Sequence, residues 1–158
     1  MSLTNVPLQP IERGELHVMH ARGAVSALAL IAIAAIIEIV FADELPIQGV
    51  LAGVALVVAL WLAVVAPPRR WRHWRYAFTG TELHVAHGWW TRIHTIVPVL
   101  RVQHIDLAQG PLERIFGVAR LVLHTAGTAS TIVTLPGVAR ETAEQIRDDI
   151  RARIGSAA

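Results

Sequence analysis

Histidine side chains are the residues of this sequence whose type best suits metal or proton-transfer chemistry. There are eight of them and no cysteine, so a thiolate metal site and a disulfide are both excluded. His84 and His87 lie three positions apart on an expected strand, which sends them to opposite faces, and His94 on the returning strand could approach one of them. No acid joins them at ligand spacing, and His104 and His124 are equally isolated. We therefore interpret them as surface or hairpin-pair histidines and predict no metal site.

Signatures of catalysis are missing from the sequence. It contains no phosphate-binding glycine pattern of the Walker or Rossmann type, no HExxH and no GxSxG. Glu113 and Arg114 are adjacent charges in a loop, where a structural salt bridge or a helix cap explains them better than an acid–base pair. We predict a protein that is not an enzyme and has no cofactor or catalytic residue.

Two adjacent tryptophans, Trp89 and Trp90, occupy an expected loop tip and are followed by Arg92. One of them could fold back onto the edge of a sheet. Tryptophan is also favoured at membrane interfaces and as an anchor in protein interfaces. These three residues are therefore candidates for contact with a partner or with lipid.

A basic and aromatic block separates the apolar half of the chain from the rest. Residues 67–76 carry four arginines and no acid, whereas the formal charge of the whole chain is only +2. Such a block could bind nucleic acid, but it directly follows an uncharged apolar run, where a membrane-interface anchor is expected. We predict no nucleic-acid binding and assign the block to the interface: Arg69, Arg70, Trp71, Arg72, Trp74 and Arg75.

Two apolar runs, 24–42 and 47–66, precede this block. A helix of twenty residues spans about 30 Å, the thickness of the hydrocarbon core. Because only residues 43–46 separate the runs, we predict a two-helix transmembrane hairpin over 24–66. The alternatives are a pair of core helices, for which the remaining chain is too small, and a signal peptide cleaved after Val40-Phe-Ala42, which the second run disfavours.

The placement of charges predicts the orientation of the hairpin. The connecting turn carries Asp43 and Glu44, whereas arginines flank the hairpin on its outer sides. The positive-inside rule then places both termini in the cytoplasm and the acidic turn outside.

Two features inside the apolar runs are candidate sites. Glu38 is an intramembrane acid, which could snorkel to the interface, pair with a partner or relay a proton. Gly49 and Gly53 form a GxxxG spacing, which we interpret as helix packing within the hairpin, with a dimer face as the alternative.

After Tyr76 the pattern changes to short strands. Alternation and turn residues predict strands over 81–87, 92–97, 99–107, 119–125 and 130–135, the third of them with a slip or bulge. Residues 109–117 read as a loop with one helical turn, and Pro136-Gly137 as the end of the last strand. An amphipathic helix is expected over 138–154, covering an open end of the small sheet or barrel.

Residues 76–154 resemble the bacterial pleckstrin-homology (PH) domain, of the type found in small YdbS-like membrane proteins. The resemblance rests on several sequence pieces, which occur in the expected order: Tyr76-Ala-Phe-Thr, Leu83-His-Val with Gly88, Ile96-Val-Pro, Arg101-Val-Gln-His-Ile, Gln109-Gly-Pro-Leu-Glu-Arg-Ile-Phe-Gly-Val-Ala and Thr125-Ala-Gly. It implies a PH-like antiparallel β-barrel or sandwich capped by a C-terminal helix. Two tryptophans at 89–90 depart from the family pattern, which disfavours a phosphoinositide-type site there.

With this resemblance we expect a multi-pass protein of the bacterial inner (plasma) membrane. Residues 1–23 would form a cytoplasmic N-terminal segment, 24–66 the hairpin, 67–76 a juxtamembrane linker and 77–158 the cytoplasmic PH-like domain. The expected function is interaction at the cytoplasmic face: a homo-oligomer or a hetero-complex with a related PH-domain membrane protein, supported by anionic lipid headgroups. The alternatives are a sensor of anionic lipid headgroups and, less favoured, a subunit of a small transporter or enzyme complex.

Overall fold

A computed structural model describes residues 6–42, 48–126 and 132–157 of the chain. It divides into two compact units: Leu16–Arg69, and a second unit that combines Met1–Glu15 with Arg70–Ala158. The predicted acidic turn with Asp43 and Glu44, and the expected hairpin turn around Gly127, lie outside the described residues.

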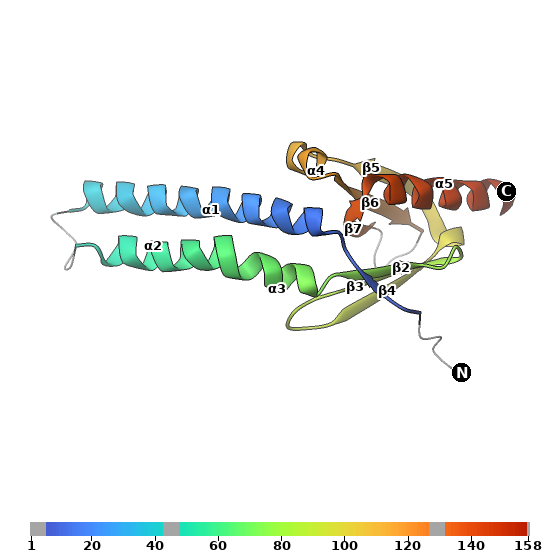
Figure 1. The fold of residues 1–158 in the computed structure, drawn as a ribbon, viewed down its shortest axis with the longest axis horizontal. Coiled ribbons are helices and arrows are strands. Elements are labelled where there is room, and N and C mark those ends of the chain that lie inside the picture. The colour runs from blue at the N-terminus through green and yellow to red at the C-terminus, as the bar shows by residue number, and fades with distance from the viewer. Residues whose placement is uncertain (1–5, 43–47, 127–131, 158) are drawn as a thin grey trace. The chain divides into compact units, whose positions relative to one another are not determined.

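The helical unit is built from α1 (Arg13–Val40), α2 (Val50–Leu60), a π-helical turn (Trp61–Val65) and α3 (Ala66–Arg72) (Figure 1). α2, the π turn and α3 form one continuous helix, so the unit holds two helices long and apolar enough to cross a membrane, Arg13–Val40 and Val50–Arg72. The predicted pair of apolar helices is confirmed. Helix α1 starts at Arg13, well before the apolar run at Ala24, so much of the expected lead-in is helical.

Two consecutive prolines explain the π turn. Pro67 and Pro68 have no backbone N–H, so the regular α-helical bonds to the carbonyls four residues earlier are lost. The Ala66 N–H bonds instead to the Trp61 carbonyl, five residues back, which is the π-helical register. The carbonyl of Leu62 in this turn lies against Gly23 of α1, where a Cβ would stand only 2.5 Å from the oxygen.

Close contact between the two helices, which the sequence analysis assigned to Gly49 and Gly53, is made at Gly23. A Cβ added at Gly49 or Gly53 would meet no atom of the described residues within 4 Å, so the predicted glycine packing is not seen in this part of the hairpin. The physical reason is that Gly49 is not in the helix: it adopts φ 86° at the N-cap of α2 and so cannot share a helical stripe with Gly53. Gly49 and Gly53 as a face for another chain stays a prediction.

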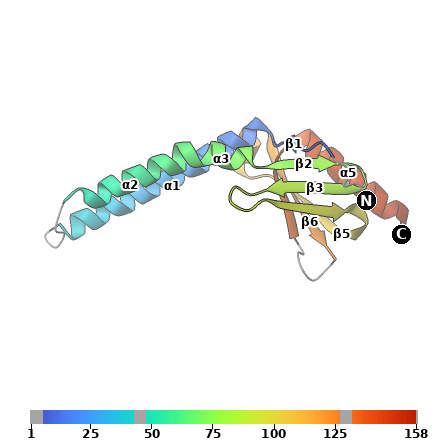
Figure 2. The ribbon, with the colours of Figure 1, turned by 90° about the horizontal axis from the view of Figure 1, so that it is seen from below.

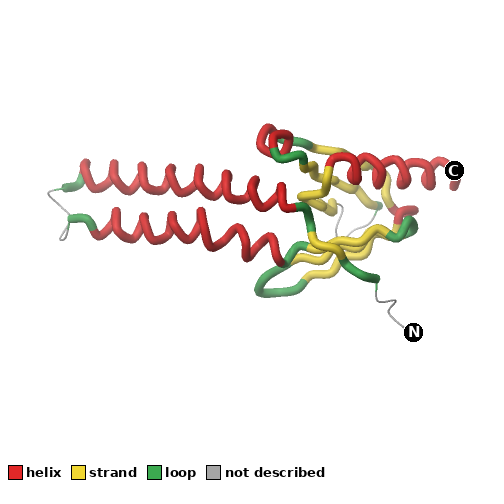
Figure 3. The backbone as a smooth tube through the Cα atoms, viewed as in Figure 1, coloured by secondary structure: helices red, strands yellow, loops and turns green. Residues whose placement is uncertain are grey.

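The second unit contains two antiparallel sheets (Figures 2 and 3). One has the strand order β1 (Gln9–Pro10), β2 (Arg75–Phe78), β3 (Glu82–His87), β4 (Ile93–Pro98). The other has the order β5 (Val102–Ala108), β6 (Val118–Thr125), β7 (Ile132–Ala139), and a 3₁₀ turn (Val99–Arg101) joins the two sheets. The sheets stay open, so the sandwich form of the predicted PH-like fold is correct and a closed barrel is not formed.

Helix α5 (Arg140–Ala157) covers the second sheet with a fully apolar face. Ala143, Ile146 and Ile150 are buried, and the helix contacts β5, β6 and β7. The predicted amphipathic helix is confirmed, but it begins at Arg140, because Val138 and Ala139 still pair with β6. Pro136 does not end the strand, since it falls at a register shift in the ladder where its missing N–H is tolerated.

Residues 9–15 are part of this second unit, which the sequence did not reveal. Gln9 and Pro10 pair with Tyr76 and Arg75. The side chain of Ile11 is 2% exposed, and the Glu12 N–H donates to the carbonyl of Gly137 at 2.8 Å. A two-residue strand of this kind leaves no periodic signal in a sequence.

Candidate functional site

The arginines and the tryptophans of the juxtamembrane block behave differently. Its four arginines are exposed: Arg69, Arg70, Arg72 and Arg75. Trp71 and Trp74 are half-buried, and each makes a specific contact: the indole N–H of Trp71 donates to the Glu12 carbonyl at 3.0 Å, and Trp74 stacks on His87 with ring centroids 4.6 Å apart. The two tryptophans thus fasten the block to the sheet, whereas contact of its arginines with lipid headgroups stays a prediction.

The Trp89-Trp90 tip projects from the turn between β3 and β4. Trp89 is 56% exposed and Trp90 is 90% exposed, so neither folds back onto the sheet, and their rings meet edge to face at 6.1 Å. Gly88 sets the turn with φ 111°, and a Cβ there would clash with the carbonyl of Thr91. Arg92 is exposed beside the tip. The turn therefore presents two large aromatic rings and one cation to the outside.

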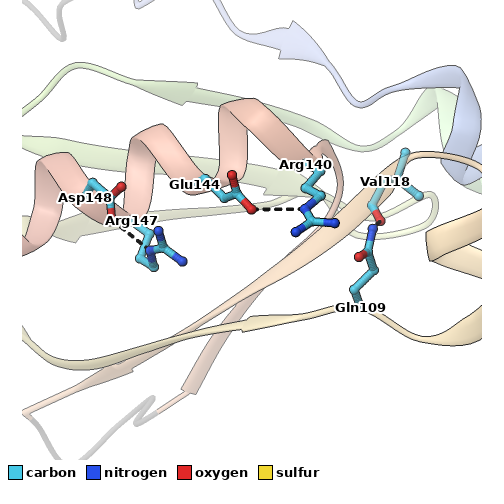
Figure 4. Close-up of polar contacts among 6 residues, drawn as sticks. All are labelled: Gln109, Val118, Arg140, Glu144, Arg147 and Asp148. Atoms are coloured by element: carbon cyan, nitrogen blue, oxygen red, sulfur yellow. Dashed lines mark hydrogen bonds and ion pairs between the residues drawn. The ribbon is translucent and has the colours of Figure 1, made fainter.

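The loop motif around Glu113 forms a second tip. Glu113 is 2% exposed and accepts from the backbone N–H of Gly110, an interaction that caps α4 (Pro111–Ile115). It also pairs with Arg120 at 2.6 Å. The side-chain amide of Gln109 donates to the Val118 carbonyl at 2.9 Å, which ties the loop to β6 (Figure 4). The predicted capping role is observed, and its partner is Arg120.

The far end of α4 carries a surface that sequence reasoning missed. Ile115 is 74% exposed and Phe116 is 37% exposed, and both follow the exposed Arg114. Large apolar side chains are usually buried, but this helical turn is too short to point three successive residues into a core. The available signal was their position in a tight loop bracketed by Gly110 and Gly117.

The histidines do not assemble into a metal site in the described residues, where no group of three or more potential ligands lies together. His84 and His94 do approach, with ring centroids 5.5 Å apart, as the strand pairing suggested. His84 is buried, and its Nε2 lies 3.3 Å from the carboxylate of Glu82, an acid that the sequence analysis overlooked. His104 bonds to the carbonyl of Gln103, and His124 lies 3.3 Å from the Asp106 carboxylate.

Two cavities border the sheet edges. One of about 210 Å³ lies between β4 and β7, and the described residues that line it are Val85, His87, Ile93, Thr95, Ile132, Val133 and Thr134. The other, of about 310 Å³, lies between β5 and α5 and is lined by Gln103, His104, Ile105, Asp106, Arg151 and Ile154.

Glu38 has a structural partner in the helical unit. Its carboxylate accepts the backbone N–H of Ala52 at 3.2 Å. Ala52 is the third residue of α2, so this N–H has no acceptor inside its own helix. Glu38 thus caps the N-terminus of the second apolar helix, where the helix dipole also favours a negative charge.

Two regions of the second unit carry shifted pKa values. Burial, helped by the charge of Glu12, raises the pKa of the Tyr76 phenol above its usual value of 10.0. On α5 a hydrogen bond from Arg147 lowers the pKa of the Asp148 carboxyl, and the same bond raises the pKa of Arg147. That pair and the pair of Arg140 with Glu144 lie on the exposed side of α5 (Figure 4).

Open antiparallel sheets capped by a C-terminal helix, preceded by two apolar helices, define a PH-like membrane protein. The sequence matches the family described as "Bacterial PH domain" over residues 23–154, and the chain belongs to this family. It is 31% identical over 128 residues, which are 80% of this chain and 79% of the relative, to the UPF0699 transmembrane protein YdbS of Bacillus subtilis (strain 168). No solved structure matches the chain.

Proposed function

We propose that this chain is a non-enzymatic interaction protein of a bacterial inner membrane, with both termini in the cytoplasm. Its PH-like domain would associate there with another membrane-anchored chain of the same fold, a second copy being the simplest partner. The observation that carries this proposal is the open side of the sandwich between β4 and β7. We call it the open seam, formed by Ile93, Thr95, Ile132 and Thr134.

The open seam has the properties of a strand-docking surface. In the described part of the chain β4 and β7 each pair on one side only. Unpaired backbone groups on such edges are templates for another strand. Ile93 and Ile132 are 48% and 57% exposed, and none of the described residues that line the cavity between the edges is an aspartate, a glutamate or an arginine. These exposed isoleucines leave residues 93–97 and 132–135 open to strand pairing, up to Pro98 and Pro136.

Membrane anchoring would make such an association effective. Two chains confined to one bilayer meet at a high effective concentration, so a modest edge contact suffices for a defined complex. The headgroup-sensor alternative has less support, because the seam cavity has no arginine and the groove beside α5 combines Arg151 with Asp106.

The test compares the molecular mass of the detergent-solubilised full chain with that of two variants. Ile93→Glu combined with Ile132→Glu places charges on the seam and should convert a defined oligomer into a monomer. Leu100→Glu is the matched control, because Leu100 is 73% exposed outside the seam. Affinity purification from native membranes identifies a related partner if the complex is mixed. A monodisperse monomer that brings no PH-domain protein with it refutes the proposal.

A further inference from the structure

Two exposed apolar tips, each with an arginine, lie on the PH-like domain, and neither includes a residue of the open seam. The aromatic tip consists of Trp89, Trp90 and Arg92. The α4 tip consists of Arg114, Ile115 and Phe116. Trp90 at 90% and Ile115 at 74% are among the most exposed large apolar side chains in the described residues of this domain.

The aromatic tip lies at the end of the sheet where the chain arrives from the second apolar helix. β2 begins at Arg75, which pairs with Ala86, next to the end of β3. Trp74 stacks on His87, the last residue of that strand, and Gly88 then opens the turn. The turn that carries Trp89 and Trp90 is therefore held beside the juxtamembrane block.

The α4 tip lies at the same end of the domain. Gly14 packs so closely on it that a Cβ would stand 2.5 Å from the Phe116 carbonyl. Gly14 is in the first turn of α1, and the neighbouring Glu12 accepts the indole N–H of Trp71. Both tips therefore lie at the end of the domain that also holds Gly14 and the juxtamembrane block, and Figure 1 shows α4 and the β3–β4 turn at one end of the domain.

Both tips are held in place by interactions that leave their apolar side chains outside. The aromatic turn depends on the positive φ of Gly88, and α4 depends on the buried Glu113 with Arg120. Arginine beside tryptophan, isoleucine and phenylalanine suits the headgroup layer of a bilayer, where apolar side chains insert and guanidinium groups meet lipid phosphates.

We propose that the two tips insert together into the headgroup region of the anionic bilayer that the hairpin spans. The domain then rests on the membrane at two points in addition to its covalent connections, and its rotation over the surface is restricted. The proposal is independent of whether the open seam binds a partner.

The test places a polarity-sensitive fluorophore on each tip of the full chain, which contains no native cysteine. Thr91→Cys labels the aromatic tip, and Ile115→Cys labels the α4 tip. Leu100→Cys is the control: it is 73% exposed next to Arg101, but its turn bonds to Thr81, before the start of β3, at the opposite end of the sheet. The labelled proteins are reconstituted into vesicles that carry a quencher on the lipid headgroup.

In vesicles containing phosphatidylglycerol, both tip labels should be quenched about threefold or more over the Leu100→Cys label. Arg92→Gln with Arg114→Gln, or 1 M salt, should reduce that quenching, whereas Arg101→Gln should not. Water-like emission at either tip, or equal quenching with phosphatidylcholine alone, would overturn the proposal.

A protein partner on the tips gives a different result. The labels would then be shielded from water by the partner, and only in the oligomer. The seam variant Ile93→Glu with Ile132→Glu would therefore return both labels to water-like emission. Quenching that persists in this monomeric variant supports the bilayer as the occupant. Quenching that disappears with the oligomer overturns the proposal and leaves the proposed association intact.

Discussion

The presence of an acidic residue, Glu38, in an apolar helix can be explained by helix capping, with no role in transport. Its carboxylate accepts the N–H of Ala52 at the start of the second helix. Glu38→Gln keeps an accepting oxygen, so the thermal stability of the protein in detergent should change little. Glu38→Leu leaves this N–H without its cap and should lower the free energy of unfolding by about 1–2 kcal/mol. Equal losses in both variants would contradict the capping role, and a transport activity that Glu38→Gln abolishes without loss of stability would indicate proton transfer.

The buried phenol of Tyr76 is expected to make the folded chain less stable at alkaline pH. It is the only tyrosine, and the chain has no lysine or cysteine. No other type of side chain in this sequence ordinarily titrates around pH 10. Burial raises the pKa of the Tyr76 phenol in the folded chain above 10.0. The contribution of the protonated phenol to the free energy of unfolding is therefore fully present below about pH 10. Above it the unfolded chain loses its proton first, and stability falls as the pH rises through the folded pKa.

The measurement is the melting temperature of the full chain between pH 9 and 11.5. Tyr76→Phe has no proton to lose, so its melting temperature should fall less over this range than that of the parent chain. Identical pH profiles for the two proteins would show that the phenol is not responsible.

At the scale of elements, the two apolar helices approach at one glycine and not at the pair that the sequence indicated. Gly23→Ala would push a Cβ against the Leu62 carbonyl, so the hairpin should lose stability in detergent by about 1–3 kcal/mol. Gly53→Ala meets open space and gains helix propensity, so it should be neutral or stabilising by up to about 1 kcal/mol. A reversed order of melting temperatures would contradict this packing.

The elements that the sequence predicted are those with a long periodic pattern. The two apolar helices and the C-terminal amphipathic helix follow from hydrophobic runs and spacing, and the resemblance supplied the PH-like class. Three contacts could not be read in this way. Gly23 meets Leu62 because two prolines create a π turn, Glu113 pairs with Arg120 across a strand, and Gln9 pairs with Tyr76 from the other side of the hairpin. Each depends on residues that the fold brings together.

At the scale of the whole molecule, the PH-like domain is discontinuous in the chain. Its unit takes Met1–Glu15 from before the helical hairpin and Arg70–Ala158 from after it. Ile11 and Glu15 are 2% and 3% exposed, and Gly137 packs against both. A fragment that starts at residue 70 therefore lacks part of its own core.

This arrangement predicts that residues 6–15 stabilise the domain from outside its main sequence. A soluble chain in which a short flexible linker joins 6–15 to 70–158 should melt at a higher temperature than 70–158 alone. In the full chain Ile11→Ala should cost about 2–5 kcal/mol of unfolding free energy, because it removes a fully buried side chain. Leu100→Ala, on an exposed side chain, should cost less than about 0.5 kcal/mol. If 70–158 is as stable as the linked chain, the first residues are not part of the core, and the domain would begin at the juxtamembrane block instead.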